Sequence, residues 1–159
     1  MKCYFCGYGL RNGDGLSGDC ITSFAIPDLG VLFRTRRKGA RFECEYLALL
    51  TLLEFLSVNS TTVGNQKFEI LSDSAVVVYQ LTKKMPVSSK LMPYYRRVTK
   101  YRNELNFDIS WIPQSVNRAA QPVPALPPLK VKFNFNFALA KRDIEQPSNS
   151  DFPTISGEP

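Results

Sequence analysis

Two carboxylates, Glu45 and Asp73, occupy positions from which they could face one crevice. The apolar stretch at residues 42–56 predicts a helix, and at 100° per residue Glu45 falls within about 40° of Leu49 on its buried face. Asp73 directly follows a predicted strand at 68–71, and open α/β sheets place their sites at the carboxyl ends of strands. The pattern therefore predicts a paired-carboxylate site at one edge of a sheet.

Each acid also has an ordinary structural explanation. A carboxylate in the first turn of a helix is favoured by the helix dipole, and Asp before a helix is a common N-cap. Both interpretations stay open for Glu45 and Asp73 taken singly, and it is their arrangement that favours a site.

The cysteines and the lack of histidine limit the chemistry further. Cys3 and Cys6 have the Cys-x-x-Cys spacing typical of zinc sites, but Cys20 and Cys44 are isolated and the chain has no histidine. We therefore expect four reduced, mostly buried thiols and no zinc site. Catalysis by a Ser-His or Cys-His pair is excluded because histidine is missing.

The positive charge of the chain is concentrated in its middle. Of the net charge of +6, residues 61–120 account for +5, from nine Lys or Arg against four Asp or Glu. Basic residues are interleaved with tyrosines there, which suits a phosphate-backbone partner but is also typical of a solvated helix face. Neither an apolar run of about 18 residues nor a signal peptide is evident, so a cytoplasmic protein without a membrane partner is expected.

Hydrophobic periodicity and turn residues predict the order of the elements. Three antiparallel strands come first, then a buried helix leads into a strand by a right-handed parallel crossover, and further helices precede the last strand of the sheet. The predicted strands are residues 2–8, 20–26, 30–36, 68–71 and 106–112. The predicted helices are residues 42–56, 74–84 and 88–105, with a loop at 59–66 and a short helix starting at 117–120.

The C-terminal part carries the clearest alternation in the chain. In residues 129–139, apolar residues alternate with lysine and asparagine, which predicts a strand whose apolar face needs cover from this domain or from a second copy. The expected organisation is a domain at 1–125, a strand extension at 126–144, and a disordered tail at 145–159 that is rich in Pro, Ser and Asp.

Three segments together resemble the ribonuclease H family, in particular its type 1 branch and the plant and archaeal relatives. The family's helix signature is matched by ECEYLALLTLLEFL, its strand followed by Asp-Ser by FEILSDSAVVVYQL, and its last strand and Pro-x-x-x-Asn loop by FDISWIPQSVNRAAQ. The resemblance covers residues 2–121. It implies an α/β fold with a mixed five-stranded sheet, three antiparallel strands followed by parallel ones, helices on both faces and, here, an extra C-terminal strand.

The resemblance also implies a catalytic set of four carboxylates that hold two Mg²⁺ and cleave the RNA strand of an RNA/DNA hybrid. Two of these positions are retained as Glu45 and Asp73, which would be the metal ligands. The other two are substituted, by Cys6 in the first strand and by Gln121 after the last. Two-metal hydrolysis should largely fail without the lost oxygen ligands, so at most one weakly bound Mg²⁺ or Mn²⁺ is expected.

Two substitutes for the lost first-strand acid are conceivable. Asp14 or Asp19 could enter from the loop after the first strand, or Cys6 could bind a softer ion such as Zn²⁺. Both are disfavoured, because a loop acid is poorly preorganised and a thiolate changes the preferred geometry of the metal.

The positions that would bind nucleic acid are altered as well. Where the family has a pair of asparagines before the helix, this chain has Arg41 and Phe42. The predicted nucleic-acid contacts come from the glycine loop, the retained motifs and the basic helix, and are Gly7, Asn12, Arg41, Ser74, Arg96, Arg97, Lys100 and Asn117.

Three functions are compatible with these residues. The first is a catalytically impaired ribonuclease H-like domain that binds nucleic acid, either an RNA/DNA hybrid or RNA, or serves in assembly. The second is a divergent but active metal-dependent ribonuclease that uses Glu45 and Asp73. The third is a protein-interaction domain that forms a homodimer through its C-terminal strand.

Overall fold

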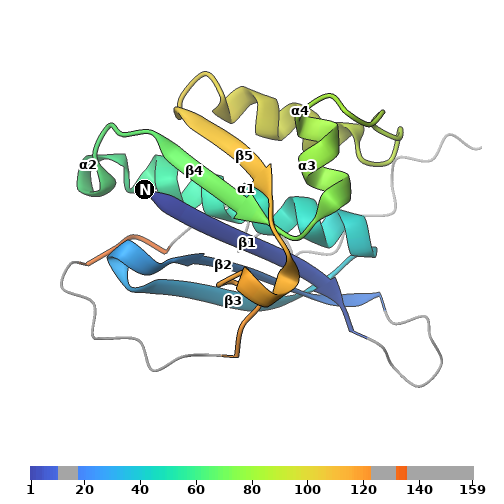
Figure 1. The fold of residues 1–159 in the computed structure, drawn as a ribbon, viewed down its shortest axis with the longest axis horizontal. Coiled ribbons are helices and arrows are strands. Elements are labelled where there is room, and N and C mark those ends of the chain that lie inside the picture. The colour runs from blue at the N-terminus through green and yellow to red at the C-terminus, as the bar shows by residue number, and fades with distance from the viewer. Residues whose placement is uncertain (11–17, 123–131, 136–159) are drawn as a thin grey trace, which may run out of the picture.

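The computed structural model of the chain describes residues 1–10, 18–122 and 132–135. Its centre is one mixed five-stranded sheet with the strand order β3-β2-β1-β4-β5 (Figure 1). The first three strands pair antiparallel, whereas β4 pairs in parallel with both β1 and β5. The strands are β1 Lys2–Gly9, β2 Asp19–Ile26, β3 Val31–Lys38, β4 Phe68–Ser72 and β5 Phe107–Trp111. The five predicted strands of the sheet and its mixed topology are confirmed.

The helices of the described residues connect or follow these strands. They are η1 Pro27–Leu29, α1 Arg41–Val58, α2 Ser60–Val63, α3 Ala75–Leu81, α4 Met92–Tyr101 and η2 Gln114–Val116. Among them, none is both long enough and apolar enough to cross a lipid bilayer.

Three helix predictions need correction. The loop predicted at 59–66 contains the short helix α2. The helix predicted at 88–105 is shorter, because α4 begins at Met92 with Pro93 in its first turn, where the missing proline N–H has no helical partner to lose. The α-helix predicted to start at 117–120 does not form, and the 3-10 helix η2 lies just before it.

Helix α1 is the centre of the core and packs on one face of the sheet (Figure 1). Every residue from Cys44 to Leu53 is buried, because the sheet, α3 and α4 surround the helix. Tyr46 of α1 stacks on Tyr94 of α4, with ring centroids 6.2 Å apart. The opposite face carries a smaller cluster formed by Cys6, Ala25 and Ala119, the last of which follows η2.

Strand β1 and the first turn of α1 approach each other closely at Gly7. A Cβ atom on Gly7 would lie 2.5 Å from the backbone nitrogen of Glu45 and 2.6 Å from the carbonyl carbon of Cys44. Since backbone atoms cannot move aside as flexible side chains do, only glycine fits here. This contact fixes the start of α1, and with it Glu45, against the strand.

A disulfide joins Cys20, near the start of β2, to Cys44 in the first turn of α1. Cys3 and Cys6 are free and buried. The prediction of four reduced thiols is therefore wrong for one pair. The linear spacing of 24 residues gives no sign that the fold brings the two Cα atoms to 6.3 Å, which is within disulfide range.

The described part of the C-terminal extension, residues 132–135, packs on the same chain without forming a strand. Phe133 and Phe135 lie beside Phe55 of α1, with ring centroids 5.5 and 5.3 Å away. The side-chain amide of Asn59 donates to the backbone carbonyl of Asn134 and accepts from its N–H. The rest of the predicted strand at 129–139 and of the extension at 126–144, and the whole predicted tail at 145–159, lie outside the described residues.

Candidate functional site

Several elements meet at one edge of the sheet. β1, β4 and β5 run in the same direction, so their carboxyl ends lie together, and α1 and α3 begin at the same edge (Figure 1). Phe5 pairs with Ser72, and Ser72 pairs with Trp111. Cys6 directly follows Phe5, and Asp73 directly follows Ser72. The predicted site residues of β1 and β4 therefore meet here, at what we term the carboxyl edge.

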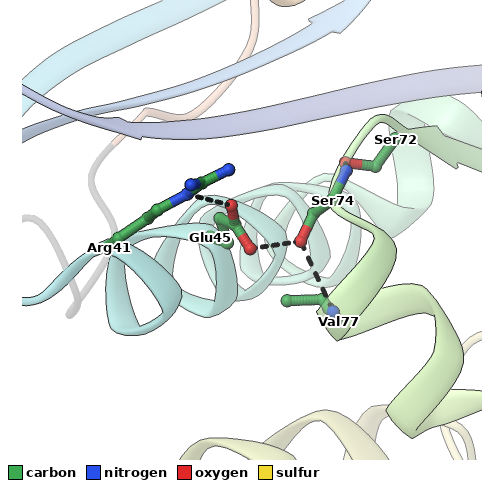
Figure 2. Close-up of polar contacts among 5 residues, drawn as sticks. All are labelled: Arg41, Glu45, Ser72, Ser74 and Val77. Carbon is green, nitrogen blue, oxygen red and sulfur yellow. Dashed lines mark hydrogen bonds and ion pairs between the residues drawn. The ribbon is translucent and has the colours of Figure 1, made fainter. Parts of the chain in front are cut away.

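A chain of hydrogen bonds connects Glu45 of α1 to the start of α3 (Figure 2). The Ser74 hydroxyl donates to Oε2 of Glu45 and, as the N-cap of α3, accepts from the N–H of Val77 at 3.4 Å. The Ser74 N–H donates to Oγ of Ser72 at 3.1 Å. Oγ of Ser72 donates to the carbonyl of Phe5 at 2.9 Å. Glu45 is thereby fixed relative to both β4 and β1.

Glu45 is a buried carboxylate whose surroundings favour the protonated form. Only 5% of its surface is exposed. Burial raises its pKa and the negative charge of Asp73 adds to this, while the hydrogen bond from Ser74 and the Arg41 guanidinium oppose the rise. Nε of Arg41 lies 3.5 Å from Oε1, but that side chain is 74% exposed, so solvent screens its charge. A carboxylate with such a perturbed pKa at the end of a sheet is typical of a functional site.

Asp73 directly follows β4 and is held by Asn117. Nδ2 of Asn117 donates to Oδ1 of Asp73 and to the carbonyl of Phe5, the latter at 2.9 Å. Oδ1 of Asn117 accepts from the N–H of Ala119 at 3.0 Å. Asn117 is completely buried. Its amide therefore fastens the segment after η2 to the ends of β1 and β4.

Cys6 belongs to the same cluster as the two carboxylates. Burial raises the pKa of its thiol to about 12, with further contributions from the charges of Asp73 and Glu45 and from a hydrogen bond with Asp73. The thiol is therefore protonated at neutral pH. A protonated thiol is a poor nucleophile, and sulfur is a poor ligand for a hard cation.

The side chain of Gln121 is directed toward η2. Its Nε2 donates to the carbonyl of Ser115 at 2.9 Å. Its backbone carbonyl accepts a hydrogen bond from Arg34 at 2.8 Å. The substituted position thus supplies no carboxylate for a metal held by Glu45 and Asp73.

These residues do not fit a two-metal centre. Among residues 1–10, 18–122 and 132–135, no three His, Cys, Asp or Glu side chains are grouped as they would be around a metal ion. The four expected positions supply two carboxylates, one neutral thiol and one amide that is directed elsewhere. Since Mg²⁺ requires hard oxygen ligands, this donor set does not support two-metal hydrolysis.

Of the two loop acids, only Asp19 lies within the described residues, and it does not replace the lost first-strand acid. Asp19 forms an ion pair with Arg36, with an N–O distance of 2.6 Å. It lies four residues before Ser23, the partner of Cys6 in the β1–β2 register, which is roughly 13 Å along the strand. Asp14 lies outside the described residues.

Three of the predicted nucleic-acid contacts are buried. Gly7 packs on the backbone of α1, and the side chains of Ser74 and Asn117 make hydrogen bonds within the fold. Their burial argues against direct contact with nucleic acid and assigns them a positioning role. Asn12 lies outside the described residues.

The basic contacts are accessible. Arg41, Arg96 and Lys100 are exposed, and Arg97 is partly buried. The last three belong to α4, which packs along α1 and therefore lies beside the helix that carries Glu45. A polyanion that is bound at the carboxyl edge and extends along α4 would meet these cations.

Sequence reasoning missed Arg34 of β3. Its guanidinium donates to the carbonyls of Ala119 and Gln121, at 3.0 and 2.8 Å. Its positive charge also acts on Cys6, where it opposes the rise in the thiol pKa. No local signal distinguishes Arg34 from Arg36 in the same strand, because both are basic residues at alternate positions.

Known structures with similar folds include several ribonucleases H. The structure of LC11-RNase H1 in complex with an RNA/DNA hybrid matches with a TM-score of 0.61 and 20% identity, covering 74% of this chain and 88% of that chain. RNase H1 of the halophilic archaeon Halobacterium salinarum matches at 0.55 and 22%, covering 74% and 89%. The N-terminal RNase H domain of a Mycobacterium tuberculosis protein matches at 0.55 and 18%, covering 73% and 85%.

The sequence comparisons identify the family. No curated protein is significantly similar to the chain in sequence. The sequence model of the reverse transcriptase-like family matches residues 30–123, which is more than half of the chain. Together with the shared fold, this confirms the ribonuclease H-like assignment, and the chain belongs to the reverse transcriptase-like family.

Proposed function

We propose that this domain binds nucleic acid at the carboxyl edge and has lost efficient RNA hydrolysis. The observation that carries the proposal is the state of the four expected ligand positions. Glu45 and Asp73 are carboxylates, Cys6 is a neutral thiol, and the amide of Gln121 is bonded to η2. Two Mg²⁺ bring four positive charges, and two carboxylates balance only half of them.

Positive groups of the chain itself already lie at this cluster. Arg41 is ion-paired with Glu45, and the charge of Arg34 acts on Cys6. Asp73 accepts hydrogen bonds from Asn117 and from the Cys6 thiol. A divalent ion would have to compete with all of these contacts, which supports a binding role over a hydrolytic one.

Charge supports nucleic acid as the ligand. The chain has a net charge of +6, Arg41 is exposed at the carboxyl edge, and Arg96 and Lys100 are exposed on α4, which packs along α1. Each phosphate contact with such a cation releases counterions and makes binding weaker as salt rises. The similar LC11-RNase H1 was solved with an RNA/DNA hybrid, which makes a hybrid the first ligand to test.

The test is anisotropy of a labelled RNA/DNA hybrid at several salt concentrations, with the RNA then analysed on a denaturing gel. We expect a Kd that rises with salt and RNA that stays intact in Mg²⁺ and in Mn²⁺. Arg96→Gln and Lys100→Gln should each weaken binding and lower the salt slope by about one. Lys2→Gln, which removes an exposed cation at the other end of β1, is the matched control and should change neither.

A divergent active nuclease is the second candidate. One observation favours it, namely that the fold brings Glu45 and Asp73 so close that the charge of one affects the pKa of the other. These two residues would then hold one weakly bound Mg²⁺ or Mn²⁺. Hybrid cleavage that is lost in both Asp73→Asn and Glu45→Gln would establish this function in place of the first.

A homodimer through the C-terminal strand stays a separate prediction. Phe133 and Phe135 pack on Phe55 of the same chain, so the described part of the extension favours cover by its own domain. Light scattering decides the matter, because a dimer would have twice the 18.0 kDa of the chain.

A further inference from the structure

Exposed aromatic side chains are concentrated at the carboxyl edge. Among the described residues, Tyr8, Phe42, Trp111 and Phe135 are the aromatic residues with large exposed fractions. The first three lie at the end of β1, at the start of α1 and at the end of β5. Phe135 instead packs against Phe55. Three of these four exposed aromatic residues therefore lie on elements that begin or end at the carboxyl edge.

Phe42 lies directly beside the buried carboxylate. It precedes Glu45 by three residues, so the two occupy neighbouring positions on the helix surface. The Arg41 guanidinium lies over the Phe42 ring, 5.6 Å from its centroid. Phe42 is 40% exposed and the Arg41 side chain 74% exposed. Ring and cation together present an exposed aromatic surface with a positive charge over one face of the ring.

Trp111 is the second open aromatic surface at the carboxyl edge. It pairs in register with Ser72, the residue before Asp73, and the N–H of Ile112 donates to the Ser72 carbonyl at 2.9 Å. Trp111 is 47% exposed. Exposed apolar residues that gather in one region, rather than singly, mark ligand or partner sites.

We propose that the carboxyl edge binds an unpaired nucleic-acid segment, with bases stacked on Phe42 and Trp111 and a phosphate beside Arg41. This inference rests on the proposed function and names its ligand class as single-stranded RNA or DNA. Bases in a duplex have their faces covered by neighbouring bases, whereas a single strand leaves them open to aromatic rings and to arginine. Aromatic surfaces with an adjacent cation therefore select for unpaired bases.

Trp111 provides the readout, because it is the only tryptophan of the chain. The full chain is titrated with a 12-nucleotide single strand and with the RNA/DNA hybrid of the same sequence, while tryptophan fluorescence and anisotropy of the labelled oligonucleotide are followed. The single strand should quench the fluorescence and bind at least tenfold more tightly than the hybrid.

Variants test whether a base stacks on the Phe42 ring. Phe42→Ala should weaken binding of the single strand about tenfold, the loss expected for one stacked base. Phe42→Leu, which keeps the apolar bulk and removes the ring, should weaken it similarly and serves if the alanine variant does not fold. Met85→Ala is the matched control, since it removes an exposed apolar side chain between α3 and α4, and it should leave binding unchanged.

The outcomes distinguish this inference from the function on which it rests. Binding of the hybrid as tight as that of the single strand, with unchanged Trp111 fluorescence, would overturn the inference and leave the proposed function standing. Failure of both nucleic acids to bind would overturn both, and would leave a protein as the partner for the aromatic surfaces.

Discussion

Asn117 and Asp73 are joined by a hydrogen bond from the side-chain amide to Oδ1 of the carboxylate. The two residues come from the segment after η2 and from the end of β4, and the same amide also reaches the Phe5 carbonyl on β1. Asp73 thus has a structural task, since it helps to hold three segments together. The carboxyl edge is both a junction of the fold and its candidate site.

Asn117→Ala should destabilise the domain strongly. The buried Ala119 N–H would lose its partner and the Phe5 carbonyl one of its two side-chain donors, and such losses in a buried region cost about 2 to 3 kcal/mol. Urea unfolding measures the change in the free energy of unfolding. Asn103→Ala, at an exposed asparagine after α4, is the control and should change it by less than about 0.5 kcal/mol. Equal stability of the two variants would show that Asn117 does not hold these segments together.

Glu45→Gln should stabilise the domain, and more so as pH rises. Burial raises the Glu45 pKa, so between the ordinary value of 4.5 and the raised one the native state binds more protons than the unfolded state. Stability from this group is therefore lost as pH increases through that window, and the glutamine variant escapes the loss. The difference in Tm between Glu45→Gln and the wild-type protein, measured from pH 4 to pH 8, should widen as pH rises. A gap that stays constant over this pH range would contradict it.

Gly7→Ala should destabilise by about 3 kcal/mol, because its Cβ would lie 2.5 Å from the backbone of Glu45 and α1 would have to move. Gly9→Ala in the same strand is the matched control, since a Cβ there meets nothing within 4 Å. Chemical unfolding of both variants compares them directly. A tolerated alanine at Gly7 would mean that β1 and α1 do not approach as described.

Reduction of the Cys20–Cys44 disulfide should lower the free energy of unfolding by about 3 kcal/mol. This is the usual effect of opening a disulfide that joins residues 24 positions apart. The Cys20→Ala/Cys44→Ala double variant should not respond to the reductant. Thiol titration in denaturant gives a second check, because Cys3 and Cys6 alone should react before reduction and all four cysteines after it. Four reactive thiols without reductant would show that the pair is not bonded.

Much of the fold follows from local sequence patterns. The strand at the start of the chain, the all-round apolar helix with Glu45 on its buried side, and the strand that ends before Asp73 are all found where periodicity places them. The helix at Ala75–Leu81 forms despite its valines, because its apolar residues recur at helical spacing.

What local pattern could not provide is long-range geometry. Gln121 follows the motif of the retained asparagine, yet its amide is directed to Ser115, because η2 and a turn replace the expected helix. Arg34 reaches the same segment from another strand, and Cys20 meets Cys44 across the fold. Such contacts depend on where elements pack, and spacing along the chain carries no record of them.

Single-turnover cleavage of an RNA/DNA hybrid, with protein in excess so that weak binding does not hide activity, tests the central claim most directly. Wild-type protein and Asp73→Asn are compared in Mg²⁺ and in Mn²⁺, with an active ribonuclease H as the positive control for the substrate. The loss of two ligand carboxylates predicts that the hybrid is bound and that wild-type and variant rates are the same. A wild-type rate clearly above that of Asp73→Asn in either ion would contradict it.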